Sequence, residues 1–357
     1  MHYWLNTISL LFILLFTSCA TAVYVPLEIL RPSETILPDS LRTLAIVINT
    51  PERTLVEDEG EIIDAYNERQ RLQIKRGNLI PHFVKSVSSS LKQASGKTLS
   101  VVSMQNDPMT EYILPEDKIR LIKDSLNADA ILSLDRLSVI PSIHLTQVDE
   151  ALFFGDLDIA VYADLKLYMG EKYLPSVFSC KDTISWQSYG ETENRTLDRF
   201  PSFQNCLIDA TNHSGYQVSK KFYPYIDNAD RFYFVTPYPL MKEANSYWNR
   251  GNYEEASYLW EYVYENAEKM GRKAKAAANM ALYEELNDRY DSALDWVKKS
   301  LNIFLESPEK YSNYIEYLLE YQQQLNVRIQ ENRQMAFGNI LFIFILESLI
   351  YFLSLVE

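Results

Sequence analysis

Three aspartates on one alternating segment have the spacing that a cation site would need. Asp156, Asp158 and Asp164 are separated by even offsets within residues 153–169, so an extended chain places their carboxylates on one face. Carboxylate oxygens are ligands for hard divalent cations, but the same alternation is typical of the solvated face of a half-buried strand. We expect the solvated face, and the sequence predicts no metal site.

The remaining residue types that perform catalysis are scattered along the chain. His82, His144 and His213 have no metal-ligating neighbour two to four residues further on, which indicates structural or surface roles. The chain has 10 glycines in 357 residues, and it contains no glycine-rich phosphate loop, no GxSxG elbow and no HExxH motif. The sequence therefore predicts no catalytic residue and no cofactor, and we expect a protein that is not an enzyme.

Cys19 is the residue whose surroundings predict a specific reaction. Residues 1–18 carry no Lys, Arg, Asp or Glu, and the apolar run at 8–16 ends in Thr17 and Ser18, as in a secretory signal. This run is shorter than the roughly 20 residues that span a membrane. Phe16-Thr17-Ser18-Cys19 resembles a lipobox, the bacterial signal after which the cysteine is acylated and becomes the new N-terminus.

That resemblance implies a membrane anchor at Cys19, and because Ala20 is not Asp, it implies the periplasmic face of an outer membrane. The alternative is an ordinary secretory signal in which Cys19 has no role. The net charge of −14 makes nucleic acid and anionic membrane surfaces poor long-range partners. Cys180 and Cys206 could form a disulfide in an oxidising compartment, although the sequence does not fix the distance between them.

The first half of the chain reads as an α+β domain with a mixed sheet. Residues 21–38 contain three prolines and are expected to be an extended tether, and the charged residues 52–76 are expected to form a surface helix or a mobile excursion. The patterns then predict strands at 44–48, 99–104 and 130–134, helices at 79–94 and from Pro115, and a long hairpin over 153–169 and 173–189. A helix near 203–222 and a strand at 231–235 complete this part.

An internal repeat follows Pro237 and Pro239. The segments GNYEEA and DRYDSA recur at an offset of 37 residues, with an aromatic residue after the Gly251 or Asp288 position and a small residue, Ala256 or Ala293, beyond it. This pattern resembles the tetratricopeptide repeat, an α-helical hairpin whose period is 34 residues. The simpler alternative is a pair of helical hairpins that belongs to no repeat family.

The resemblance implies a concave face that binds extended peptides or helices. The first helix of each pair would present to it five candidate partner-binding residues, Asn245, Trp248, Asn249, Leu282 and Glu285. A tryptophan in this position is more often part of a helix-helix core. We therefore expect a protein or peptide partner, with core packing as the alternative role for these side chains.

The predicted organisation has five parts: a signal peptide (1–18), a lipid anchor and tether (19–40), an α/β domain with a long β-hairpin (41–236), tetratricopeptide-like helical repeats (237–334) and a hydrophobic C-terminal helix (335–357). The last part carries one charge, Glu347, over residues 336–356. It is long enough to span a membrane, but it could equally dock on the repeats, form a second anchor or be an altered end.

The whole layout resembles a family of uncharacterised bacterial lipoproteins that is classed only as a domain of unknown function. Our leading hypothesis is a lipid-anchored envelope protein that acts as a binding or scaffold protein. The alternatives are a periplasmic hydrolase or carbohydrate-acting enzyme, which would need two facing carboxylates in a pocket, and a small-ligand-binding α/β domain.

Overall fold

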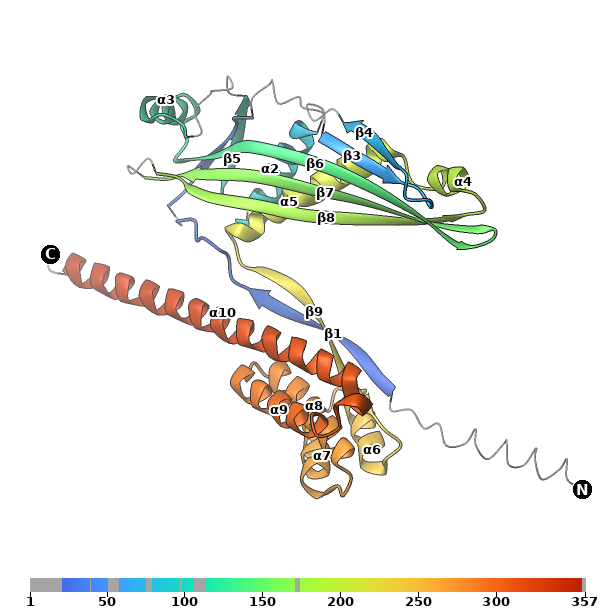
Figure 1. The fold of residues 1–357 in the computed structure, drawn as a ribbon. Helices are drawn as coiled ribbons and strands as arrows, with labels where there is room; N and C mark the ends of the chain where they lie inside the picture. Colours follow the sequence, from blue (N-terminus) through green and yellow to red (C-terminus); the bar gives the residue numbers. More distant parts are fainter. Residues whose placement is uncertain are drawn as a thin grey trace, which may run out of the picture. The chain divides into compact units, whose positions relative to one another are not determined.

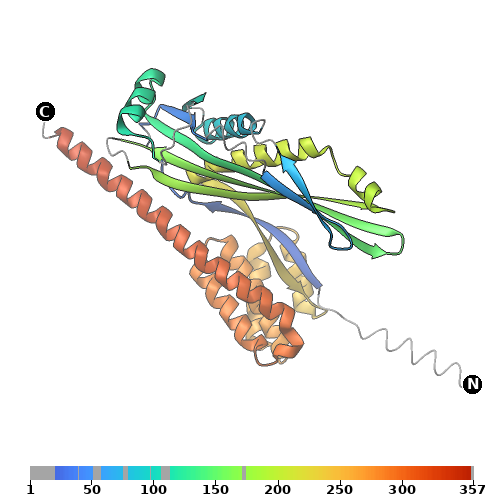
Figure 2. The same cartoon turned by 45° about the horizontal axis from the view of Figure 1, so that its top comes forward.

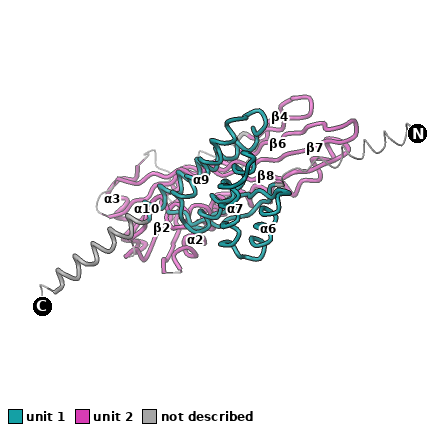
Figure 3. Tube along the Cα trace, turned by 90° about the horizontal axis from the view of Figure 1, so that it is seen from below, with its two compact units in different colours: residues 1–32, 225–357 teal, residues 33–224 magenta. Residues whose placement is uncertain are grey.

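The computed structural model describes residues 21–38, 40–50, 58–74, 79–96, 98–105, 113–170 and 174–354, with side chains on the last helix described as far as Met335. The chain divides into two compact units, shown in Figures 1 and 3: unit 1 comprises Met1–Pro32 and Tyr225–Glu357, and unit 2 comprises Ser33–Pro224. The fold is α+β, as predicted, with the mixed sheet in unit 2 and helices following it.

Unit 2 is built on a mixed sheet whose central strand is β6 (Ala130–Asp149). One edge of β6 pairs in parallel with β2 (Thr43–Ile48) and further along with β3 (Asp58–Ile63), while the other edge pairs antiparallel with β7 (Leu152–Tyr168). β5 (Ser100–Gln105) extends the sheet beyond β2, β4 (Arg69–Ile74) beyond β3, and β8 (Ser176–Gly190) beyond β7. Figure 2 shows β6, β7 and β8 running side by side over a long distance.

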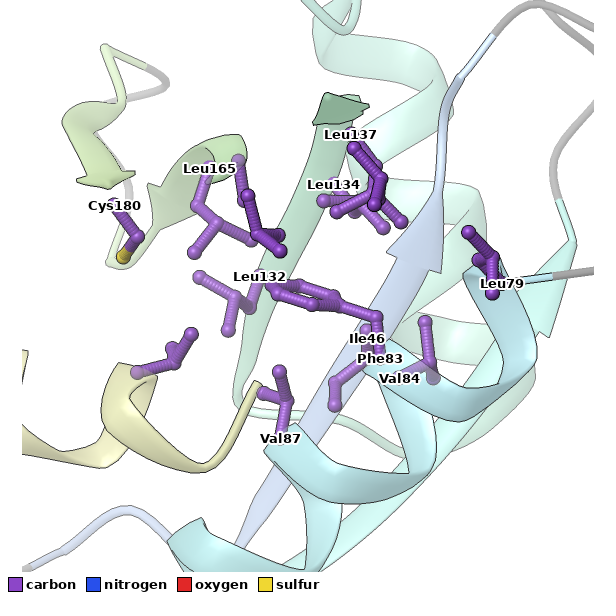
Figure 4. Close-up of a cluster of buried hydrophobic side chains, with 14 of the residues drawn as sticks. Ile46, Leu79, Phe83, Val84, Val87, Leu132, Leu134, Leu137, Leu165 and Cys180 are labelled. Atoms are coloured by element: carbon purple, nitrogen blue, oxygen red, sulfur yellow. The ribbon is translucent and has the colours of Figure 1, made fainter. Parts of the chain in front are cut away.

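Helices cover both faces of this sheet where the short parallel strands lie. α2 (Ile80–Ala94) and α5 (Phe203–Gln217) pack on one face, where Ile46 and Leu132 meet Phe83 and Val87 of α2, as Figure 4 shows. α3 (Glu116–Leu126) covers the other face through Ile119 and Ile122. Because strand side chains alternate, Ala45 and Val47 belong to this second layer, and two-sided burial explains the continuous apolar run of β2.

The predicted strands and helices occur in the predicted order, but three segments differ from the prediction. Residues 52–76 were expected to form a helix or an excursion, whereas β3 and β4 form a hairpin with Asn67 in the left-handed region at its turn. β6 was predicted as five residues and has twenty. A register shift between Leu134 and Arg136 offsets the buried positions by one residue, and this interruption hides the continuation of the strand in the sequence.

The third error concerns the predicted tether. Thr21–Arg31 forms strand β1, which pairs antiparallel along its whole length with β9 (Tyr225–Val235), from Thr21 opposite Val235 to Arg31 opposite Tyr225. Pro26 suggested an irregular segment, but a two-stranded ladder leaves each strand a free edge on which a proline is tolerated. The strand predicted at 231–235 was assigned to the α/β part, whereas the structure pairs it with β1 in unit 1.

Unit 1 surrounds β9 with helices in two hairpins. α6 (Pro239–Trp248) and α7 (Tyr253–Asn266) form the first hairpin, and α8 (Met270–Leu286) and α9 (Tyr290–Phe304) form the second. The two turns fall where the repeat predicted them, and Gly251 and Asp288 both have positive φ there. Ala256 and Ala293 are fully buried, because the paired helices approach each other closely at these positions.

The last helix, α10 (Pro308–Ser354), has non-helical backbone angles at Tyr311 and packs against α9. The side chains of the predicted hydrophobic segment at 335–357 lie outside the described residues from position 336 onward, and so does Cys19 with its predicted lipidation. Within the described part of the chain, no helix has the length and apolar character needed to cross a membrane.

Candidate functional site

The groove of the helical hairpins is filled by the chain's own strand β9. Arg231 of β9 forms a bidentate ion pair with Glu285 of α8, with Nε 2.7 Å from Oε2 and Nη2 2.9 Å from Oε1. Both side chains are almost completely buried. Tyr321 of α10 donates a hydrogen bond of 2.6 Å to the same Glu285 carboxylate, and Gln324 accepts one from Arg231. The pair is therefore hydrogen-bonded on all sides, as a buried charge must be.

The titration behaviour of this cluster follows from its burial. Burial disfavours the charged guanidinium, but the hydrogen bond and the negative charge of Glu285 outweigh that effect and raise the pKa of Arg231. Burial and the nearby Glu285 charge raise the pKa of Tyr321 well above its usual value. Burial also raises the pKa of Tyr317 to about 12. At neutral pH the Arg231 guanidinium is charged and the two phenols are uncharged.

Asn279 of α8 holds the backbone of β9 as a neighbouring strand would. Its side-chain oxygen accepts a hydrogen bond of 2.6 Å from the backbone N–H of Phe234, and its side-chain nitrogen donates one of 2.9 Å to the Phe234 carbonyl. The Tyr317 hydroxyl accepts from the N–H of Phe232 in the same manner. These contacts satisfy backbone groups on the edge of β9 that β1 does not pair.

Four of the five residues predicted to bind a partner, all except Leu282, contact β9. Tyr233 of β9 donates a hydrogen bond of 2.6 Å to the side chain of Asn245, and the side-chain oxygen of Asn249 lies 3.2 Å from the same hydroxyl. The ring of Tyr233 packs 5.4 Å from that of Trp248. Trp248 and Leu282 are buried in the core of unit 1.

This arrangement corrects the expectation of an open groove at Trp248, Leu282 and Glu285. The face that carries Asn245, Trp248 and Glu285 contacts an extended segment of the same chain, strand β9, which was predicted to belong to the α/β domain. The Trp248 side chain therefore has the core role that was stated as the alternative, packed against Tyr233, Tyr253 and Trp260.

A second feature of unit 1 was not predicted, and we call it the basic pocket. It is a cavity of about 930 Å³ at the beginnings of α6, α8 and α10. Its lining consists of Thr236, Pro237, Tyr238, Pro239, Lys269, Met270, Gly271, Arg272, Lys275, Lys310 and Tyr311. Four of these residues are cationic and none is acidic.

Aromatic rings orient the cations of the basic pocket. The Arg272 guanidinium lies 4.1 Å from the centre of the Tyr238 ring, and the Lys310 ammonium lies 5.1 Å from that of Tyr311. Such contacts attract a cation to the face of a ring and restrict its side chain. Gly271 allows Tyr311 to approach α8, because a Cβ at Gly271 would lie 2.6 Å from the Tyr311 hydroxyl.

The sequence hid this pocket because its cations are scattered over 42 positions, from 269 to 310 in a chain rich in acids. Glu268 and Glu309 are adjacent to lining cations in the sequence, which makes each stretch read as mixed surface charge. The signal that could have indicated the pocket is the start of α8, where residues 269–275 include four cations, three of which line the pocket, and where the first turn has no acid.

The three aspartates of β7 lie on the solvated face of the sheet in unit 2. Asp158 accepts a hydrogen bond from Ser185, and Asp164 pairs with Arg136 at 2.8 Å. Burial, followed by the charge of Asp158, raises the pKa of Asp156. No group of three or more His, Cys, Asp or Glu side chains within the described ranges is arranged to hold a metal ion.

The histidines and internal cysteines take structural positions. His144 hydrogen-bonds Ser142 at 2.9 Å, His213 lies 3.4 Å from Asp182, and His82 is half-buried on α2. Cys180 and Cys206 are buried free thiols, so the possible disulfide is not formed. Burial raises the pKa of Cys180 to about 11 and also raises that of Cys206, which makes both thiols weak nucleophiles at neutral pH.

Two family models match separate stretches of the chain. Residues 97–234 match a domain of unknown function, DUF8603, and residues 242–327 match another, DUF6340. The gap between the two matches falls at the change of character predicted near Pro237, and the first match ends within β9. A comparison with curated proteins finds no match.

Among solved structures, the chain is similar to a crystal structure from Xanthomonas campestris assigned to the family DUF330. The identity is 12%, the match covers 53% of this chain and 94% of that chain, and the TM-score is 0.23. It is also similar to a putative neuraminyllactose-binding hemagglutinin homolog from Helicobacter pylori. There the identity is 13%, the coverage is 52% of this chain and 82% of that chain, and the TM-score is 0.25.

Proposed function

We propose that this protein is a bacterial lipoprotein that faces the periplasm from the outer membrane, anchored through Cys19, and that it acts as a non-enzymatic binding or scaffold protein. The lipobox-like residues Phe16-Thr17-Ser18-Cys19 support the anchor. One observation about the fold carries the proposal further. Strand β1 begins at Thr21, two residues after Cys19, so the anchor leads directly into a folded unit.

The distance between lipid and protein is therefore short. Two extended residues span at most about 7 Å, whereas the predicted tether to residue 40 would have allowed roughly 70 Å. Two or three acyl chains would anchor the chain stably, because each buried methylene contributes about 0.8 kcal/mol. Unit 1 would then lie at the membrane surface.

Contacts along β1 explain why this attachment would be firm. Arg31 forms an ion pair with Glu331 of α10 at 3.0 Å and another with Asp227 of β9 at 3.1 Å. Arg328 of α10 donates a hydrogen bond of 2.7 Å to the carbonyl of Leu30. Since β9 is in turn held by Asn279 and Glu285, unit 1 is a suitable attachment unit for a scaffold protein.

Because β9 fills the groove of the helical hairpins, a protein partner would bind to other surfaces, including those of unit 2. Unit 2 is inserted in the chain between β1 and β9, and a scaffold of this design would carry it on two strands rather than one linker.

Metabolic labelling with a fatty acid in a bacterial host tests the anchor. We expect the wild-type chain to incorporate label and lose residues 1–18, and Cys19→Ser to remain unlabelled and uncleaved, since acylation requires the thiol. Cys206→Ser is the matched control, and it should be labelled like the wild-type chain. Equal labelling of wild-type and Cys19→Ser chains would refute the lipoprotein assignment.

A further inference from the structure

The basic pocket concentrates positive charge in a chain whose net charge is −14. Lys269, Arg272, Lys275 and Lys310 line it without an acidic residue. At physiological ionic strength, exposed charges beyond about 8 Å are largely screened. The groups nearest to a bound ligand therefore determine its local potential, and those groups are cations, although the chain as a whole repels anions at long range.

Backbone donors add to the side chains. α8 begins with the pocket residues Met270 and Gly271, and it has neither a side-chain N-cap hydrogen bond nor an acid in its first turn, whereas α6 begins with Pro239, which has no backbone N–H to offer. The first N–H groups of a helix lack intrahelical acceptors, and the helix dipole favours negative charge at that end. Oriented N–H groups together with Lys and Arg side chains are the combination that binds phosphate groups in proteins.

The pocket adjoins the end of the ladder where the chain leaves for its anchor. Val235 pairs with Thr21, the first residue of β1, and the next residue, Thr236, lines the pocket. Cys19 precedes Thr21 by two residues, which span at most about 7 Å. A membrane that holds the acylated Cys19 would thus bring its headgroups close to the pocket.

We infer that the basic pocket binds a phosphate group, and that its source is the headgroup of an anionic phospholipid in the membrane that holds the anchor. Lys269 and Lys310, which are exposed, meet the phosphate first, and Arg272 offers it two parallel N–H groups. The lipid source rests on the proposed anchoring through Cys19, whereas phosphate binding by the pocket does not.

Calorimetric titration of the full mature chain, in a neutral detergent, with inorganic phosphate tests the shared chemistry. We expect saturable binding that weakens at least tenfold in Lys269→Gln/Arg272→Gln. The matched control, Lys298→Gln/Arg250→Gln, removes one Lys and one Arg outside the pocket and should stay within twofold of wild type. Lys310→Gln changes an exposed position and should weaken binding about threefold. It replaces the double variant in this test if the double variant is poorly folded.

Absence of saturable heat in the wild-type chain, or equal weakening by the two double variants, would overturn phosphate binding. If the wild-type chain is not acylated but still binds phosphate, the proposed anchor and the lipid source of the phosphate are refuted. Phosphate binding by the basic pocket then still stands. The two proposals therefore fail separately.

Photocrosslinking distinguishes a lipid headgroup from free phosphate. The acylated chain is placed in phosphatidylcholine vesicles that contain a photoactivatable phosphatidylglycerol, and crosslinked peptides are identified. We expect crosslinks at 236–239 and 269–275, at least fivefold fewer in Lys269→Gln/Arg272→Gln and unchanged in the control. Crosslinks spread evenly over unit 1 would identify free phosphate as the ligand and refute the lipid source.

Discussion

Asn279 is the single residue on which the attachment of β9 depends most directly, because one side chain satisfies two backbone groups of Phe234. Asn279→Ala would leave a buried N–H and a buried C=O without partners, each of which costs about 1–3 kcal/mol. We expect the free energy of unfolding of unit 1 to fall by roughly 2–4 kcal/mol.

Urea unfolding followed by tryptophan fluorescence measures this change, since Trp248, Trp260 and Trp296 all lie in unit 1. Asn326→Ala is the control: Asn326 is exposed on α10 and bonds only to the Gln322 carbonyl. It should change the stability by less than about 0.5 kcal/mol. A similar loss in both variants would show that Asn279 has no special role.

Because of Tyr317, we expect the free energy of unfolding of unit 1 to fall as the pH rises above 10. Burial raises its pKa to about 12, while an unfolded tyrosine titrates near 10. Below pH 10 the phenol is protonated in both states, so its contribution to stability is fully present. Between pH 10 and 12 only the unfolded state loses the proton, and the free energy of unfolding falls by up to about 1.4 kcal/mol per pH unit.

Unfolding curves at several pH values between 9 and 12 test this dependence. Tyr317→Phe should have a visibly smaller decline over this range, whereas the exposed Tyr258→Phe should follow the wild-type chain. A decline that is the same in all three chains would mean that other groups, such as Tyr321, account for it.

At the scale of elements, Ala256 decides whether α6 and α7 can pair. It is fully buried at the position where the two helices approach, so Ala256→Glu would place an unpaired carboxylate in the core. We expect a loss of several kcal/mol, on the order of 3–5, and a lower melting temperature for unit 1. Tyr258→Glu, on the exposed side of the same helix, should melt within a few degrees of the wild-type chain.

The elements that were predictable from sequence are those whose burial depends on local pattern. The hairpin of β7 and β8 and the turns at Gly251 and Asp288 follow from alternation and repeat spacing. β1 was missed because its partner, β9, is distant in sequence and decides its conformation. β3 and β4 were missed because their charged and polar residues show no clear alternation of apolar side chains, although the two strands are neighbours in sequence. The basic pocket was missed because the start of α8, which supplies three of its cations, meets Lys310 of α10 and residues 236–239 only in the folded chain.

Residue patterns could not indicate what the predicted face contacts. Helical spacing predicts that Asn245, Trp248 and Asn249 share a face of their helix. Nothing in that spacing distinguishes a foreign peptide from a strand of the same chain. The pairing of Thr21 with Val235 joins residues more than 200 positions apart, and helical spacing does not predict such a pairing.

At the scale of the whole molecule, unit 2 should fold without unit 1. Its two ends are held together by a backbone hydrogen bond of 2.9 Å from Thr35 to Lys221 and by the ion pair between Glu34 and Lys221. It has its own core, which includes Phe83 and Leu132. We expect a chain of residues 33–224 to unfold cooperatively in urea, with its single tryptophan, Trp186, as the probe.

The reciprocal chain tests the same idea. Replacing residues 33–224 by a short Gly-Asn turn joins Pro32 to Tyr225 as a hairpin, and unit 1 should keep its melting temperature within about 5 °C. A joined chain that does not fold would show that unit 2 supplies part of the stability of unit 1.

The ladder of β1 and β9 also determines how mechanical load passes through an anchored molecule. If unit 2 is pulled away from the membrane, the tension runs from Cys19 along β1 to Ser33. β1 is already extended, so it transmits the load with almost no lengthening, and the helices lie outside the load path. A pull on α10 would instead separate Thr21 from Val235, which pair at one end of the ladder, and would break the hydrogen bonds between β1 and β9 one after another. The same protein would therefore be inextensible when held by unit 2 and would yield by unzipping when held by its last helix.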